Sequence, residues 1–105
     1  MASWEQYSAA VAISSAGANA IVAATAGRKI CVIGYVLMAA AAVNVKWQSA
    51  STDKTGLLYP AANGGAVAGL APDYKFWFEC AEGEALNLNL SGAVAVGGHV
   101  TYILK

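Results

Sequence analysis

The chain has 105 residues, which suffices for one modest hydrophobic core, and we expect a single domain. Hydrophobic residues make up 58% of the chain and charged residues 11%, against usual values of about 45–50% and about 25%. Six basic and six acidic residues give no net charge, which argues against a nucleic-acid-binding protein, because counterion release requires a basic face. A small, neutral and apolar protein is poorly protected against self-association, so we expect part of its surface to be covered.

Residues 30–45 contain no charge and at first sight resemble a membrane helix with basic flanks. The stretch is shorter than the roughly 20 residues that a spanning helix needs. Its first half is β-branched and aromatic, which favours a strand, and residues 43–48 then alternate between apolar and polar side chains. The N-terminus has no basic region and carries Glu5, so it does not resemble a secretory signal. We expect no membrane span and synthesis in the cytoplasm.

The N-terminal half contains short apolar segments that are separated by turn residues, a pattern that predicts strands. The alanine run 39–42 is too short to nucleate a helix, and we expect a bend there. Residues 1–7 precede the first predicted strand and are expected to form an arm. The predicted strands cover residues 8–13, 20–23, 30–38 and 43–49.

The C-terminal half begins with a polar loop, residues 49–56, and also contains a Gly- and Ala-rich connection, residues 61–72. Its predicted strands cover residues 57–59, 74–81, 85–90 and 99–104, the last being entered from residues 94–96. Eight or nine short strands at roughly ten-residue spacing, without helical periodicity, predict an all-β fold. We expect an antiparallel two-sheet β-sandwich of jelly-roll type over residues 8–105.

The predicted strand 30–38 is apolar on both of its faces, although one face of a sandwich strand normally meets water. Simple alternation places Ile33, Tyr35 and Leu37 together on one face, which we expect to point outward. Large exposed apolar patches mark interaction sites, so we expect another subunit to cover these three residues. The alternative is that an N-terminal segment of the same chain covers them.

Trp4 and Tyr7 lie in the predicted arm. Trp and Tyr are typical anchors of protein interfaces, so both are candidate contacts with a neighbouring subunit. Capping of the chain's own sandwich is an equally open alternative. Further along the chain, Phe76 and Phe78 are expected in the core, whereas Trp77 faces the other side. A sugar-binding role for Trp77 would lack the acidic and amide side chains that usually accompany such a site.

Candidate catalytic and metal-binding residues are few. His99 is the sole histidine, and general acid–base catalysis needs a positioned partner that the sequence does not offer. Glu82 and Glu84 flank a glycine, but calcium takes six to eight oxygens, so a solvated turn explains them better. We therefore expect no enzyme, no metal and no cofactor. Cys31 and Cys80 are expected to be buried free thiols.

Several motifs between residues 20 and 102 resemble those of small proteins of tailed bacteriophages and prophages. These are the I-V-x-A-x-x-G-[KR]-[KR]-I turn at residues 21–30, the G-Y-x-L strand at 34–37, the S-T-D loop at 51–53 and the G-E-A-L-N-L-N-L strand at 83–90. The chain is similar in this respect to jelly-roll capsid decoration (cement) proteins, and it also resembles jelly-roll modules at the ends of phage fibres and tails.

The resemblance implies a structural virion protein, made in the host cytoplasm and placed on the outer surface of the icosahedral head. Its implied partners are copies of itself, with a trimer favoured and a dimer possible, and the major capsid protein. The alternative function is a receptor- or carbohydrate-binding tip of a tail or fibre, with residues 49–56 and 61–72 as the binding loops. The family has no catalytic residues to carry over to this chain.

Overall fold

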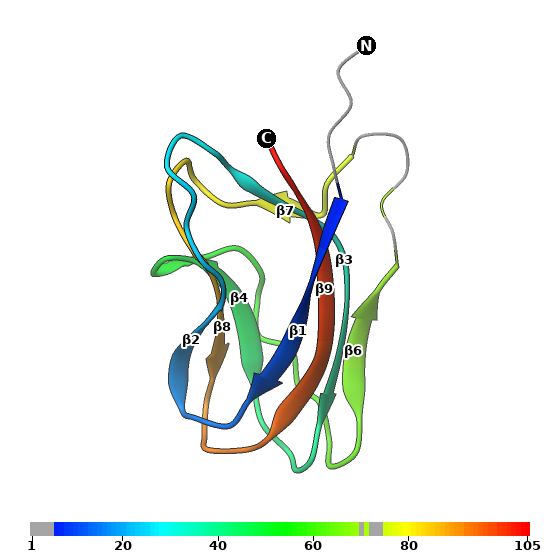
Figure 1. The fold of residues 1–105 in the computed structure, drawn as a ribbon. Coiled ribbons are helices and arrows are strands. Elements are labelled where there is room, and N and C mark those ends of the chain that lie inside the picture. The colour runs from blue at the N-terminus through cyan, green and yellow to red at the C-terminus, as the bar shows by residue number, and fades with distance from the viewer. Residues whose placement is uncertain (1–5, 70, 72–74) are drawn as a thin grey trace.

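The computed structural model describes residues 6–69, 71 and 75–105, and Figure 1 shows that its regular elements are all strands. They form two antiparallel sheets packed as a sandwich, which confirms the expected two-sheet architecture. The strands are β1 (Gln6–Ile13), β2 (Gly17–Val22), β3 (Ile30–Ala39), β4 (Val45–Ser49), β5 (Thr52–Asp53), β6 (Gly65–Ala68), β7 (Phe78–Glu79), β8 (Leu86–Leu90) and β9 (Val96–Leu104).

The strand order differs between the two layers. The five-stranded sheet has the order β1-β9-β3-β6, and β7 pairs with the other part of β3. The four-stranded sheet has the order β2-β8-β4-β5. No helix among the described residues is long and apolar enough to cross a membrane.

The leucine–asparagine alternation of β8 determines which of its faces points inward. Leu86, Leu88 and Leu90 are buried, and Asn87 and Asn89 lie half-buried on the opposite face. A strand with a period of two places one set of side chains in the core and the other toward solvent. The expectation for residues 85–90 is therefore confirmed.

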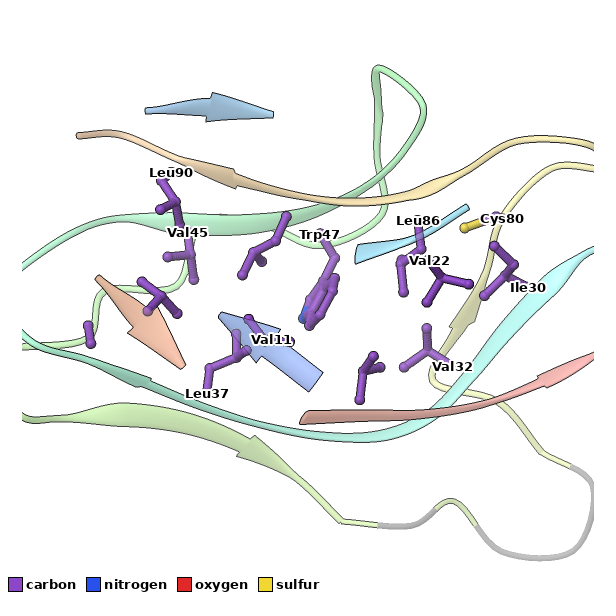
Figure 2. Packing of buried hydrophobic residues seen from close by; sticks show 14 of the residues in the cluster. Val11, Val22, Ile30, Val32, Leu37, Val45, Trp47, Cys80, Leu86 and Leu90 are labelled. Carbon is purple, nitrogen blue, oxygen red and sulfur yellow. The ribbon is translucent and has the colours of Figure 1, made fainter. Parts of the chain in front are cut away.

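Trp47 lies at the centre of the core between the two sheets, as Figure 2 shows, and its side chain is fully buried. Its ring centroid is 5.3 Å from that of Tyr35 and 6.2 Å from that of Phe78, both of which come from the five-stranded sheet. The largest fully buried side chains around it are Ile30, Val32, Leu37, Val45, Leu86, Leu88, Leu90, Val96 and Val100.

The indole N–H of Trp47 has no hydrogen-bond partner among the described residues. The hydroxyl of Tyr35 is close enough for the indole to lower its pKa, yet the two groups do not meet in hydrogen-bond geometry. Burial is the larger influence, so the pKa of Tyr35 is raised above 10.0. Tyr35 therefore stays neutral, as a phenol packed against the core must.

A β-bulge in β3 overturns the expected orientation of its side chains. Val32 pairs with Tyr102 and Gly34 with Thr101, so Ile33 is an extra residue in the pairing of β3 with β9. One extra residue moves every following side chain to the other face. Tyr35 and Leu37 therefore pack on the main core, whereas Ile33 belongs to a separate cluster. The expectation that these three residues share one outward face is wrong.

Ile33 lies on the outer face but is covered by the same chain. Together with Cys31 and Ile103 it forms a small buried cluster, against which Ala71 and Phe76 pack. The Ala71 N–H donates to the Ile33 carbonyl at 2.8 Å, which holds Ala71 over this half of the sheet. An N-terminal cover was expected as the alternative to a partner, and the residues seen here come from a later segment. Phe76 thus packs outside the main core, contrary to expectation.

Tyr7 belongs to β1, which begins at Gln6, so the arm is shorter than the expected residues 1–7. Its ring stacks on Tyr102 of the neighbouring strand with centroids 5.5 Å apart. It thereby packs on its own sheet, while its side chain keeps an exposed edge. Trp4 lies outside the described residues.

Two glycine-containing regions form strands where looser structure was expected. β6 lies within the predicted connection 61–72, and Gly65 pairs with Met38 of β3. A Cβ at Gly65 would overlap the Leu37 carbonyl oxygen, so the two backbones approach closely because this residue has no side chain. Gly97 and Gly98 similarly lie inside β9. The predicted strand 74–81 contains the much shorter β7.

Candidate functional site

The outer face of the four-stranded sheet is polar, and its side chains bond to one another. Asn89 donates from Nδ2 to Gln48 Oε1 at 3.3 Å, and Gln48 donates from Nε2 to Asp53 Oδ1 at 2.8 Å. Lys46 Nζ lies 3.1 Å from the other oxygen of the same carboxylate. The hydrogen bond from Gln48, followed by that from Lys46, lowers the pKa of Asp53. This face satisfies its own polar groups and is suited to contact with water.

The outer face of the five-stranded sheet is apolar over the half that Ala71 and Phe76 leave uncovered. Pairing across the sheet forms two rows, one through His99 and Val36, the other through Gly97 and Met38. Met38 is 59% exposed and Val67 is 71% exposed. We call this surface the apolar face, and it consists of Ala10, Ala12, Val36, Met38, Gly65, Val67, Gly97 and His99, none of which is Asp, Glu, Lys or Arg.

An open hollow of about 740 Å³ adjoins the apolar face at the end of the sheet that bears the β1–β2 turn. Apolar and small residues dominate its lining, which includes Ala12, Met38, Ala40, Ala95, Gly97 and Gly98. The hollow thus extends the apolar face around the end of the sandwich. Surfaces of this kind mark contacts with other molecules.

Charged side chains gather instead on the half of the same sheet that the chain itself covers. Glu79 lies 3.7 Å from Lys29 and 3.5 Å from Lys105, and Lys105 stands over the Phe76 ring at 5.5 Å. These side chains are more than a third exposed, so each ion pair contributes little to stability. Because these charged residues lie near Phe76, the other half of the outer face carries none of them.

The structure does not bring the predicted interface residues together on one surface. Leu37 and Ile33 are buried on opposite faces of β3, and Tyr35 is half-buried against Trp47. Tyr7 lies at the end of the sheet away from the hollow. Whether these residues contact a partner stays a prediction. The exposed side chain of β3 is instead that of Met38, which simple alternation would place on the inner face.

Ser49 is a buried hydroxyl beside a carboxylate, but its contacts are those of a structural link. Its Oγ donates to Glu84 Oε1 at 2.6 Å and accepts from the Ala81 N–H at 3.0 Å. The pair ties the end of β4 to the turn before β8. His99 lies on the outer face of the other sheet and is not part of this group. Among the described residues, no three His, Cys, Asp or Glu side chains form a group that could hold a metal.

Ser49→Ala is expected to destabilise the fold by about 1–3 kcal/mol, because it leaves the Ala81 N–H and the Glu84 carboxylate without their partner. Urea unfolding followed by tryptophan fluorescence measures the change. Ser51→Ala, at an exposed position two residues later, is the matched control and should stay within about 0.5 kcal/mol of the parent. Equal effects at the two positions would show that the hydroxyl does not tie the turn to β4.

Cys31 and Cys80 are both free and buried, as expected from the sequence. Cys80 belongs to the main core and Cys31 to the small outer cluster. Burial, and then the negative charge of Glu79, raises the pKa of Cys31 to about 12. Burial likewise raises the pKa of Cys80. Neither thiol is a reactive nucleophile in the folded chain, because the thiolate is the reacting species.

We expect a thiol reagent such as Ellman's reagent at pH 8 to leave both cysteines unmodified in the folded chain and to modify both in urea. The raised pKa also sets a direction for stability. The folded state holds the Cys31 proton more tightly than the unfolded state, so this contribution is intact below pH 9 and is lost as pH rises from 9 toward 12. Rapid modification of the native protein at pH 8 would contradict the burial of the thiols.

Comparison with protein-family models, curated proteins and solved structures finds no match to this chain. The fold, the contrast between its two outer faces and the sequence motifs of residues 20–102 are therefore the basis on which its function is proposed. The polar face has its hydrogen bonds satisfied, whereas the apolar face has no cover among the described residues.

Proposed function

We propose that this chain is a structural virion protein of a tailed bacteriophage or prophage, a decoration protein that oligomerises and binds the outer surface of the icosahedral head. The observation that carries the proposal is the uncharged, exposed apolar face of the five-stranded sheet. Proteins that act by adding buried interface need such a surface. The motif resemblance over residues 20–102 supports the same assignment.

We also propose that the sandwich is a jelly roll. The antiparallel pairs β1–β9, β2–β8, β3–β6 and β4–β5 are nested, as they would be in one long hairpin rolled up into two sheets. Strands of each nested pair lie in the same sheet, and successive pairs alternate between the sheets. This arrangement supports the eight-stranded, two-sheet pattern of jelly rolls, with β7 as an addition.

The mechanism of a decoration protein is thermodynamic. A protein that binds the assembled shell but not its dissociated subunits stabilises the shell by mass action, in proportion to the logarithm of its concentration over the dissociation constant. The major capsid protein is the proposed partner. A neutral chain suits this task because it binds without a large electrostatic field of its own.

The test is to locate the protein in purified particles of the phage or induced prophage that encodes it. Mass spectrometry of the particles and cryo-electron microscopy of the intact virion together decide the outcome. We expect the protein in the particle and density of its size on the outside of the head. Density at the tail tip would support the alternative below, and absence from the particle would contradict both.

A receptor- or carbohydrate-binding tip is the second candidate, and two exposed aromatic side chains favour it. Trp77 is 53% exposed, and its Nε1 donates to the Gly69 carbonyl at 2.6 Å, which holds the ring in place. Tyr59 is 72% exposed beside the predicted binding loops. A glycan array separates the candidates: specific binding that Trp77→Ala abolishes would favour a tip, and absence of binding would favour decoration.

A further inference from the structure

We propose that a second copy of this chain covers the apolar face, so that the five-stranded sheets of two copies pack face to face about a two-fold axis. The inference rests on the proposed function, because it names the surface through which the proposed oligomer forms. It departs from the trimer that the resemblance implies. A contact between the same patch on both copies requires a two-fold axis.

The first argument is that no described part of the chain covers this face. Gln6 begins β1 at the end of the sheet near β7, opposite the β1–β2 turn, as Figure 1 shows. The β6–β7 connection is bonded to the other half of β3 through Ala71 and Trp77.

The second argument is charge. The apolar face carries no Asp, Glu, Lys or Arg, and a partner that placed a charge against it would leave that charge buried without a counterion. A second copy of the same face meets this requirement. The polar outer face of the other sheet does not, because Lys46 and Asp53 lie on it. Self-complementarity therefore favours the same surface on both copies.

The third argument is shape. Met38 and Val67 are the most exposed large side chains of the apolar face, and both lie next to positions that have almost no side chain. Ala12 and Gly97 line the hollow beside Met38. A surface that carries both protruding and small residues can interdigitate with its own copy, at the roughly 10 Å spacing of packed sheets. We place Met38 of each copy against the small residues of the other.

The fourth argument is area, which also predicts the strength of the contact. Four strands over about four residues each cover roughly 250 Å² of flat sheet, given the usual strand spacing and rise. With side-chain relief and the hollow, each copy would bury on the order of 400 Å², or about 800 Å² in total. An interface of this size is typical of weak, transient complexes. We therefore expect a weak, reversible dimer with a dissociation constant of roughly ten to a hundred micromolar.

Sedimentation velocity of the full chain from ~1 μM to ~1 mM tests the proposal, because this range brackets the expected dissociation constant. We expect monomer at the low end and dimer at the high end. Met38→Glu and Val67→Lys, made singly, should each weaken the dimer at least about tenfold, since each buries an unpaired charge in the interface. Both positions are exposed in one copy, so circular dichroism and the melting temperature should not change at the low concentration where the parent is also monomeric.

Ala18→Glu is the matched control, because it adds a charge at an exposed position on the outer face of the four-stranded sheet. It should leave the dimer intact. A parent chain that stays monomeric to the highest concentration would overturn the inference, as would a trimer or aggregates without a fixed size. A dimer that resists both face variants, or that Ala18→Glu breaks equally, would overturn the assigned surface. None of these outcomes depends on where the protein lies in the virion, so its placement on the head is tested separately, whereas a chain that stays monomeric would also contradict the proposed oligomerisation.

Discussion

Trp47→Ala is expected to destabilise the fold by about 3–5 kcal/mol, the largest effect of any single truncation in this core. The indole is fully buried between the sheets and contacts aromatic rings from the opposite sheet, so its removal leaves a cavity that β-sheets cannot easily close. A domain of this size has a total stability of about 5–15 kcal/mol. Urea unfolding monitored by far-ultraviolet circular dichroism measures the loss as a lowered midpoint.

Trp77→Ala supplies the control for this prediction, because it makes the same chemical change at a side chain that is 53% exposed. Its loss removes one hydrogen bond to the Gly69 carbonyl, which should cost about 1 kcal/mol. The two variants therefore differ by burial rather than by residue type. Similar midpoints for both would contradict the placement of Trp47 at the centre of the core.

Gly98→Ala is expected to destabilise the fold by about 2 kcal/mol or more. Gly98 has a φ of +141°, which residues with a side chain rarely adopt, and a Cβ there would lie on the Val36 carbonyl oxygen of the adjacent strand. Relief would require β9 and β3 to separate at the middle of the five-stranded sheet. The measurement is the melting temperature, which should fall by several degrees in a chain of this length.

Gly97→Ala is the neighbouring control. Its φ is not positive, and the nearest atom to an added Cβ is the Val11 carbonyl oxygen at 3.7 Å, an ordinary contact. We expect a change in stability of less than about 1 kcal/mol, because alanine also reduces the entropy of the unfolded chain. If both variants melted at the same temperature, the close approach of β9 and β3 at Gly98 would be refuted.

The sequence predicted the elements with a clean period of two better than those without one. β8 and β4 were placed by their alternation, and β3 was placed by its β-branched run, nearly to the residue. β6 was missed because glycine and alanine have low strand propensity. β6 is a strand because it pairs with β3, where Gly65 allows a close backbone approach. Pairing with a distant strand does not produce a pattern in the local sequence.

The sequence predicted the kind of site, an apolar outer surface, but not the residues that form it. An apolar outer surface on β3 was expected, and one exists, but the bulge at Ile33 exchanged the faces of everything after it. Tyr35 and Leu37 moved into the core, and Val36 and Met38 took the outer positions. A single extra residue in a pairing depends on the partner strand, so alternation along one strand cannot reveal it. The partial cover of this face by Ala71 and Phe76 likewise depends on tertiary structure.

The pairing of the first strand with the last has a consequence for how the chain folds. β9 lies between β1 and β3, so the five-stranded sheet has no middle until residues 96–104 have been synthesised and have left the ribosome. Contacts so distant in sequence close slowly, and all-β sandwiches accordingly fold in milliseconds to seconds. Until β9 is available, β1 and β3 each lack the strand that lies between them in the folded sheet. Unpaired strand edges of this kind are prone to aggregation. The five-stranded sheet therefore closes only when β9 joins it, and both of its long neighbours gain their pairing partner in that one late step.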